Sequence, residues 1–319
     1  MEVDLDDALE RRGSGYRSAA FAATFHHEGS AVELAGSGSW LIRCAIPRAG
    51  LFDAWNCYPL LVCADWTALA SDLSRLDDVV TVTAVIDPVA DVSDDELRSA
   101  FPDHLTDYKR HLVVKLDGYD EGTLSDHHRR NLRRGRHECD VHVVEPASAG
   151  ADEWVGLYDG LRVRHGITGR ADLPPDSLRA QLAVPGATLL RATVGGVLAG
   201  MVLWMRSGDH VYYHLGGYSD LGYRSRAAYV LFDESLRHFQ GVAGLAVLGS
   251  AAGADPSTTD DGLMRFKRGW GAVERTARLG GRIVDAAAYR RLVERADPPE
   301  RYFPAYRAER ASMVPSSAR

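Results

Sequence analysis

Three apolar runs with strand character follow one another in the second half of the chain. They cover residues 187–194, 197–204 and 210–217. Gly195-Gly196 separates the first two runs, and Ser207-Gly208-Asp209 precedes the third. A Gly-Gly pair between β-rich runs is typical of a two-residue hairpin, because both central positions need a positive φ. The pattern therefore predicts three antiparallel strands.

The hydrophobic period changes after these runs. Between Ser225 and Phe239, apolar residues recur at helical spacing, which predicts an amphipathic helix. Residues 244–249 form a short, wholly apolar run, as in strands that are buried on both faces. A second helix is predicted over 260–269 and a last strand over 271–278. The predicted order is strand, strand, strand, helix, strand, helix, strand.

The first half of the chain also mixes strands with helices. Strands are predicted over residues 39–46, 79–86 and 111–116. Ser93 and Glu96 form a capping box, with the acidic residue three positions after the serine, that begins a helix. Because both halves mix the two kinds of element, we predict an α/β (α+β) fold.

Length and composition narrow the class of protein. The chain has 319 residues and is 45% hydrophobic, which is enough for two modest cores. No uninterrupted apolar run approaches the roughly eighteen residues of a membrane span. The start, Met1–Asp7, is acidic, unlike a signal peptide. Four cysteines without zinc spacing predict reduced thiols, no metal site and a cytoplasmic protein: Cys44, Cys57, Cys63 and Cys139.

The formal charge of −7 is unevenly divided. Residues 1–124 carry 10 basic and 22 acidic side chains, a net of −12, and residues 125–319 carry 27 and 22, a net of +5. A polyanionic partner would therefore be drawn to the C-terminal part.

Three separated motifs resemble the FemAB-like branch of the GNAT acyltransferase superfamily. They are His128–Arg134, Val211–Gly217 and Phe266–Trp270, and they occur in the family's order at about its spacing. The resemblance covers roughly residues 40–280. It implies two GNAT-like lobes in tandem, the first degenerate, each with a mixed, mostly antiparallel sheet flanked by helices.

We place the domain boundaries on this basis. A charged N-terminal tail covers residues 1–18, and the first lobe with a basic joining helix covers 19–140. The second, catalytic lobe covers 141–285, and a C-terminal helix and tail cover 286–319.

The resemblance implies that Phe266-Lys267 lies on the helix after the buried strand, with the lysine reaching the reaction centre. There an ammonium group would stabilise a developing oxyanion or orient a carboxylate of the acceptor. The alternative is a lysine that faces solvent within the basic run Arg265–Arg268.

The third strand supplies two more catalytic candidates, Tyr212 and His214, which share one face with His210 and Gly216. His214 would accept a proton. The alternative is a histidine that is held structurally within the strand.

The loop after this strand indicates which acyl donor the protein uses. Acetyl-CoA users carry Arg/Gln-x-x-Gly-x-Gly/Ala there, and backbone N–H groups hold the pyrophosphate. Leu221–Ala228 has Gly222 but no Gly or Ala two residues later. FemAB-like enzymes, whose donor is aminoacyl-tRNA, break this signature too. We assign donor binding to four residues: Gly216, Gly217, Arg224 and Arg226.

Two segments supply acceptor candidates. Residues 52–60 are rich in aromatic and polar residues, and FemAB-like proteins line the acceptor pocket with an Asp and a Tyr-containing loop in this place. The alternative is an Asp that caps a turn and a Tyr that packs at the domain's edge. Residues 129–136 contain five arginines, which suit phosphate binding or form a solvated helix face. We assign acceptor binding to Asp53, Tyr58, Arg129 and Arg164.

The resulting expectation is an aminoacyltransferase that needs no cofactor. It would transfer an aminoacyl group from aminoacyl-tRNA to an amine of a small molecule or a peptidoglycan-precursor-like acceptor. The alternatives are a CoA-dependent N-acyltransferase acting on a small amine and a non-catalytic GNAT-like binding module. The patterns do not determine the acyl group, the acceptor or the oligomeric state.

Overall fold

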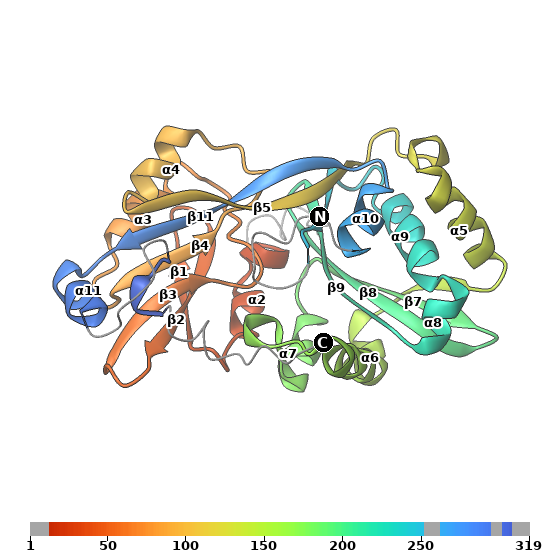
Figure 1. Cartoon of the computed structure of the whole chain (residues 1–319), viewed down its shortest axis with the longest axis horizontal. Coiled ribbons are helices and arrows are strands. Elements are labelled where there is room, and N and C mark those ends of the chain that lie inside the picture. The colour runs from red at the N-terminus through yellow and green to blue at the C-terminus, as the bar shows by residue number, and fades with distance from the viewer. Residues whose placement is uncertain (1–12, 252–261, 295–301, 308–319) are drawn as a thin grey trace, which may run out of the picture. The chain divides into compact units, whose positions relative to one another are not determined.

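The computed structural model describes residues 13–251, 262–294 and 302–307 (Figure 1). The chain divides into two compact units. Unit 1 comprises Met1–Thr24 and Lys109–Thr276, and unit 2 comprises Phe25–Tyr108 and Ala277–Arg319.

The helices and strands have the following bounds. The strands and helices of unit 1 are β6 (Asp140–Val144), β7 (Ala187–Val194), β8 (Val197–Ser207), β9 (His210–Tyr218), β10 (Leu245–Gly249), η1 (Gly15–Arg17), α2 (Ala19–Ala23), η2 (Glu121–Thr123), α5 (Asp126–Arg136), η3 (Ala147–Gly150), α6 (Ala151–His165), η4 (Gly169–Ala171), α7 (Pro175–Gln181), α8 (Asp220–Ser225), α9 (Ala227–His238) and α10 (Gly262–Arg268). Those of unit 2 are β1 (Ser30–Leu34), β2 (Ser39–Ile46), β3 (Leu51–Asn56), β4 (Thr81–Val85), α3 (Leu69–Ser74), α4 (Asp94–Ala100), α11 (Ala286–Val293) and η5 (Ala305–Arg307). Two strands contribute residues to both units, β5 (His104–Lys115) and β11 (Val273–Ile283).

The sheet of unit 1 has the order β5-β10-β9-β8-β7-β6. Its β9–β10 pair is parallel and its other pairs are antiparallel. The predicted hairpin is confirmed, and Gly195 and Gly196 have φ of 55° and 79°. Side chains other than glycine rarely adopt these angles. The predicted run of three antiparallel strands is therefore correct.

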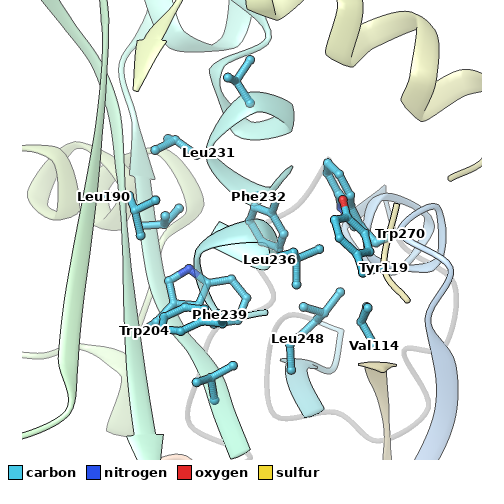
Figure 2. Packing of buried hydrophobic residues seen from close by; sticks show 14 of the residues in the cluster. Val114, Tyr119, Leu190, Trp204, Leu231, Phe232, Leu236, Phe239, Leu248 and Trp270 are labelled. Atoms are coloured by element: carbon cyan, nitrogen blue, oxygen red, sulfur yellow. The ribbon is translucent and has the colours of Figure 1, made fainter. Parts of the chain in front are cut away.

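Helices cover both faces of this sheet. Helix α9 packs on β7 and β8 and is covered by α5, whereas α6 packs on β8 and β9 beside α7 (Figure 1). The core under α9 is rich in aromatic rings, and Trp204, Phe232 and Trp270 are each almost fully buried (Figure 2). Burial of such large apolar surfaces is the main source of stability in this unit.

The predicted helix over 225–239 is interrupted at its start. Arg226 has a φ of 66° and separates α8 from α9. The predicted strand over 244–249 corresponds to β10 and the predicted helix over 260–269 to α10, although residues 260 and 261 lie outside the described part. The last predicted strand continues to Ile283 as β11.

Two predicted domain boundaries differ from the observed division. Within the predicted tail over 1–18, Gly15 N–H donates to the carbonyl of Pro185 at 2.7 Å, so this end of the chain is part of unit 1. The predicted boundary after residue 140 falls inside unit 1, because α5 packs closely on α9. A Cβ at Gly135 would lie 2.6 Å from a methyl group of Val230.

Unit 2 has a sheet of order β1-β2-β3-β4-β11, in which β3 and β4 are parallel and the other pairs are antiparallel. Its core includes Leu41, Val82 and Phe101 and is covered by α3 and α4. The predicted capping box is confirmed, because Ser93 and Glu96 bond each other's backbone N–H. The predicted C-terminal helix is α11. The predicted fold class, two lobes with mixed, mostly antiparallel sheets flanked by helices, is confirmed.

Candidate active site

The parallel strands β9 and β10 separate after a short pairing. Residues 210–212 pair with residues 245–247, and beyond Tyr212 the described part of the chain offers β9 no pairing with β10. The β8–β9 register also shifts, because Tyr213 pairs with Trp204 and Leu215 with Leu203, which leaves His214 as the extra residue of a bulge. Backbone groups on this edge of β9 are therefore available to another molecule.

Lys267 lies at the end of β10, beside this separation. Its side chain is buried, with 4% of the residue exposed, and its Nζ donates to the carbonyl of Ser250 at 2.7 Å. Nζ also lies 5.7 Å from the ring centroid of Tyr213. A Cβ at Gly249 would lie 3.2 Å from Nζ, so the glycine leaves room for the ammonium group. Lys267 is therefore buried and does not face solvent.

His128 anchors the helix that carries Phe266 and Lys267. The carbonyl of Phe266 can only accept, so His128 Nε2–H donates to it at 2.7 Å, and Nδ1 accepts from the hydroxyl of Ser125 at 3.0 Å. Burial lowers the pKa of His128 to about 4, so the ring is neutral near pH 7, as this pairing requires. A Cβ at Gly269 would lie 1.9 Å from the His128 ring. The basic helix α5 and helix α10 are therefore closely joined.

His214 and Tyr212 both contact Tyr16 and so share a face, whereas Gly216, predicted on the same face, lies toward Tyr213 because the bulge at His214 shifts the alternation. His214 Nδ1 lies 3.0 Å from Tyr16 Oη, and Nε2 lies 3.1 Å from the side-chain oxygen of Gln181. The Tyr212 and Tyr16 ring centroids are 5.0 Å apart. Burial lowers the pKa of His214 to about 3. Because both ring nitrogens are engaged inside the fold, this geometry favours the structural alternative for His214 over proton transfer.

The two glycines assigned to the donor serve packing. A Cβ at Gly216 would lie 2.4 Å from Tyr213 Oη, and one at Gly217 would lie 2.9 Å from Leu157 Cβ. Tyr213 and Tyr218, whose side chains interact, thus occupy the space that a side chain at position 216 would need. Burial raises the pKa of both tyrosine hydroxyls.

Of the two arginines assigned to donor binding, one is bonded within the protein and the other is exposed. Arg226 Nε donates to Asn131 Oδ1 at 3.1 Å, and its Nη1 donates to the carbonyl of Tyr223 at 3.0 Å, so this guanidinium holds α8 against α5. Arg224 is exposed, and its side chain has no hydrogen bond or ion pair to any described residue.

The segment that would form a pyrophosphate loop is used for packing. The backbone N–H of Gly222 donates to the hydroxyl of Ser219 at 3.2 Å. A Cβ at Gly222 would lie 1.9 Å from the carbonyl oxygen of Ala199, so the glycine lets α8 contact β8. The broken sequence signature corresponds to a turn in which the N–H of Gly222 is bonded to Ser219.

The acceptor candidates of unit 1 lie on its surface. Arg129 Nη1 donates to the carbonyl of Leu124 at 2.8 Å and so closes the loop before its own helix. Arg164 forms an ion pair with Asp220 and lies 4.6 Å from the ring centroid of Tyr223.

The acceptor candidates of unit 2 are Asp53 on β3 and Tyr58 just after it. Asp53 is fully buried and accepts from Arg307 Nε at 2.7 Å and Nη2 at 2.8 Å. The indole N–H of Trp55 donates to the same carboxylate at 3.0 Å. These bonds engage both oxygens of Asp53 within unit 2, which favours a structural role over acceptor binding.

The outward face of α5 carries three cationic side chains. Arg130, Arg133 and Arg134 lie at helical spacing on its exposed side. No described residue forms a hydrogen bond or ion pair with them. By contrast, Arg136 bonds the buried Asp233 at 2.6 Å. We call the three unpaired arginines the α5 basic face.

Three further observations concern metal ligands, membrane-spanning helices and the cysteines. The described residues contain no group of His, Cys, Asp or Glu that could hold a metal ion. Within the same ranges, no helix is both long enough and apolar enough to cross a membrane. The four cysteines are free thiols.

Comparisons with known proteins agree with this geometry. Residues 126–268 match the family described as Acetyltransferase (GNAT) domain. No curated protein matches the chain. Among solved structures, FemX has a TM-score of 0.66 at 13% identity, over 91% of this chain and 98% of that chain.

Two lysylphosphatidylglycerol synthetase structures are also similar. The C-terminal domain of a putative enzyme of this name from Agrobacterium fabrum has a TM-score of 0.61 at 15% identity, covering 88% of this chain and 90% of its own. L-PGS from Bacillus licheniformis has a TM-score of 0.56 at 14% identity, covering 90% and 93%.

The fold and the matched family model together define a GNAT-type domain over residues 126–268 of this chain. Over 91% of the chain the fold is similar to that of FemX, so the predicted resemblance to the FemAB-like branch is confirmed at the level of the fold.

The sequence patterns did not single out His111, Ser125 or Ser250 as parts of this region. Tyr213 and His128 stand inside the quoted motifs, so the motifs themselves could have identified them. Ser250 acts through its backbone carbonyl, for which no side-chain signal exists.

Proposed function

We propose that this protein is an aminoacyltransferase that uses aminoacyl-tRNA and transfers the aminoacyl group to an amine, forming an amide. The acceptor would be a small molecule or a peptidoglycan-precursor-like compound. The observation that carries the proposal is the buried Lys267, whose ammonium group lies where β9 and β10 separate. FemX and the lysylphosphatidylglycerol synthetases share this fold, and the second name denotes an aminoacylated product.

The chemistry is a single acyl transfer. The amine attacks the ester carbonyl, a C–N bond forms, the ester C–O bond breaks, and the terminal ribose hydroxyl of the tRNA leaves. The amine nitrogen gives up one proton and the departing ribose oxygen takes one up, so the products are an amide and a free hydroxyl. Lys267 would stabilise the negative charge that develops on the carbonyl oxygen, and backbone N–H groups of β9 beyond Tyr212 would bond the same oxygen.

Two features support a tRNA donor over acyl-CoA. The N–H of Gly222 is bonded to Ser219, and Gly222 packs against the carbonyl of Ala199, so this glycine does not offer the open loop that a pyrophosphate needs. The α5 basic face is exposed and unpaired, and it would bind the closely spaced phosphates of a nucleic acid.

The donor prediction is tested with purified protein and a panel of amine acceptors. We expect amide formation with charged tRNA and its loss after ribonuclease treatment. Activity that survives ribonuclease and requires an acyl-CoA thioester would reject the proposal in favour of a CoA-dependent N-acyltransferase. The absence of transfer from either donor would favour a binding module.

The α5 basic face gives a second prediction. A triple variant, Arg130→Gln, Arg133→Gln and Arg134→Gln, should bind tRNA more weakly and with less salt dependence. Each lost phosphate contact reduces the slope of log K against log salt by about 0.7–0.9, so three contacts account for about two to three units. Binding is measured by filter retention across a salt series.

The control is a second triple variant that loses the same number of positive charges on the surface of unit 2. Arg98, Arg290 and Arg291 are exposed residues of unit 2, and their triple change to Gln should leave the salt slope nearly unchanged. Equal slopes for the two triple variants would exclude α5 as the tRNA-binding surface.

A further inference from the structure

His111 lies on β5, next to the end of β10 that Lys267 reaches. Val113 pairs with Val247 and Leu112 pairs with Gly249. Continuation of this antiparallel register brings His111 beside Ser250, whose carbonyl accepts from Lys267 Nζ at 2.7 Å.

His111 is buried, and one of its ring nitrogens is unsatisfied. Only 6% of the residue is exposed, and Nδ1 has no hydrogen-bond partner among the described residues. An unpaired buried polar atom costs about 1–3 kcal/mol, so such atoms are uncommon in folded proteins. In the same unit, His128 and His214 each have both nitrogens bonded, whereas the buried indole N–H groups of Trp154, Trp204 and Trp270 also have no partner among the described residues. Among the described residues, His111 therefore has a ring nitrogen that is left for a further hydrogen bond.

The charges around His111 indicate which kind of ligand group would bond to its Nδ1. Burial, followed by the positive charges of Lys267 and Lys109, lowers the pKa of His111 to about 3. The ring is therefore neutral near pH 7 and presents a lone pair or an N–H rather than a charge. The same two cations would lower the pKa of an amine that binds beside them, and an amine must be neutral to attack a carbonyl.

We propose that His111 is the residue that binds the acceptor amine at the Lys267 site. Its Nδ1 accepts a hydrogen bond from an N–H of the neutral amine, with the ring proton on Nε2. This bond holds the amine beside the carbonyl that Lys267 polarises and directs its lone pair toward that carbon. The proposal rests on the proposed function, to which it adds the acceptor subsite.

The first test does not depend on turnover. In the full-length protein with ¹⁵N-labelled histidine, butylamine is titrated at a pH where a fraction of it is neutral. We expect the Nδ1 resonance of His111 to shift with the concentration of neutral amine, whereas the ring resonances of His214 stay in place. A His111 resonance that does not move overturns the proposal, even if the protein transfers no acyl group.

The second test compares two substitutions. His111→Phe keeps a flat buried ring and removes both nitrogens, and His111→Asn places an amide oxygen near the position of Nδ1. We expect His111→Phe to raise the KM for the acceptor about tenfold, with the KM for the donor unchanged. His111→Asn should recover part of this loss.

Stability separates binding from a structural role. Because Nδ1 has no partner among the described residues, His111→Phe should leave the melting temperature unchanged or raise it. A lower melting temperature with an unchanged acceptor KM would make His111 a structural residue and overturn the proposal. A raised donor KM would place the bond on the aminoacyl group instead and would likewise contradict it.

Discussion

Replacing Lys267 by methionine should lower turnover by about 10²-fold or more, the effect expected when one group that stabilises transition-state charge is removed. Methionine keeps the length and much of the volume of the side chain but has no charge. The ammonium group is buried, and Ser250 and Tyr213 hold it beside the separated strands, so no neighbouring water would replace its charge efficiently.

The measurement is kcat with the best donor and acceptor, together with circular dichroism and the melting temperature. The substitution also leaves the carbonyl of Ser250 without this donor, which costs about 1–3 kcal/mol of stability, so folding has to be checked. Arg265→Met is the matched control, because Arg265 is an exposed cation on the same helix. A folded Lys267→Met protein with near-normal turnover would show that the lysine is not part of the reaction centre.

Replacing Arg307 by methionine should destabilise unit 2 by about 3–5 kcal/mol, because it leaves a buried carboxylate unpaired. Asp53 is fully buried, and Arg307 bonds both of its oxygens. The free energy of unfolding is measured in urea. Arg110→Met is the control, because the Arg110–Glu274 pair is exposed and such pairs contribute only about 0–1 kcal/mol.

This prediction also tests the role assigned to Asp53. Combining Arg307→Met with Asp53→Asn should destabilise the protein by much less than the sum of the two single changes, because the pair acts as one unit. A loss below about 1 kcal/mol for Arg307→Met would mean that the pair contributes little. Asp53 would then be available for an acceptor, as the resemblance implies.

The local features of this fold could be predicted because neighbouring residues decide them. Gly195 and Gly196 allow the positive φ angles of the hairpin, and Ser93 with Glu96 begins a helix through bonds that span three residues. The spacing of apolar residues predicted α9, except at its first turn. There Arg226 adopts a left-handed conformation, and its guanidinium bonds Asn131, a residue 95 positions away.

Hydrophobic periodicity and short turns in the sequence predicted the strands and helices around the hairpin, because neighbouring residues decide them. The resemblance to a known family implied the two-lobed fold class and the candidate pair Phe266-Lys267. Only the tertiary structure decided which polar groups are already satisfied. Asp53, His214 and Arg226 were plausible ligand-binding residues until distant partners were seen to occupy them. His111 had no signal of its own, and its unpaired nitrogen beside Lys267 became visible only in the packed fold. Burial and pairing across long stretches of chain are properties of the folded protein, so no local pattern could reveal them.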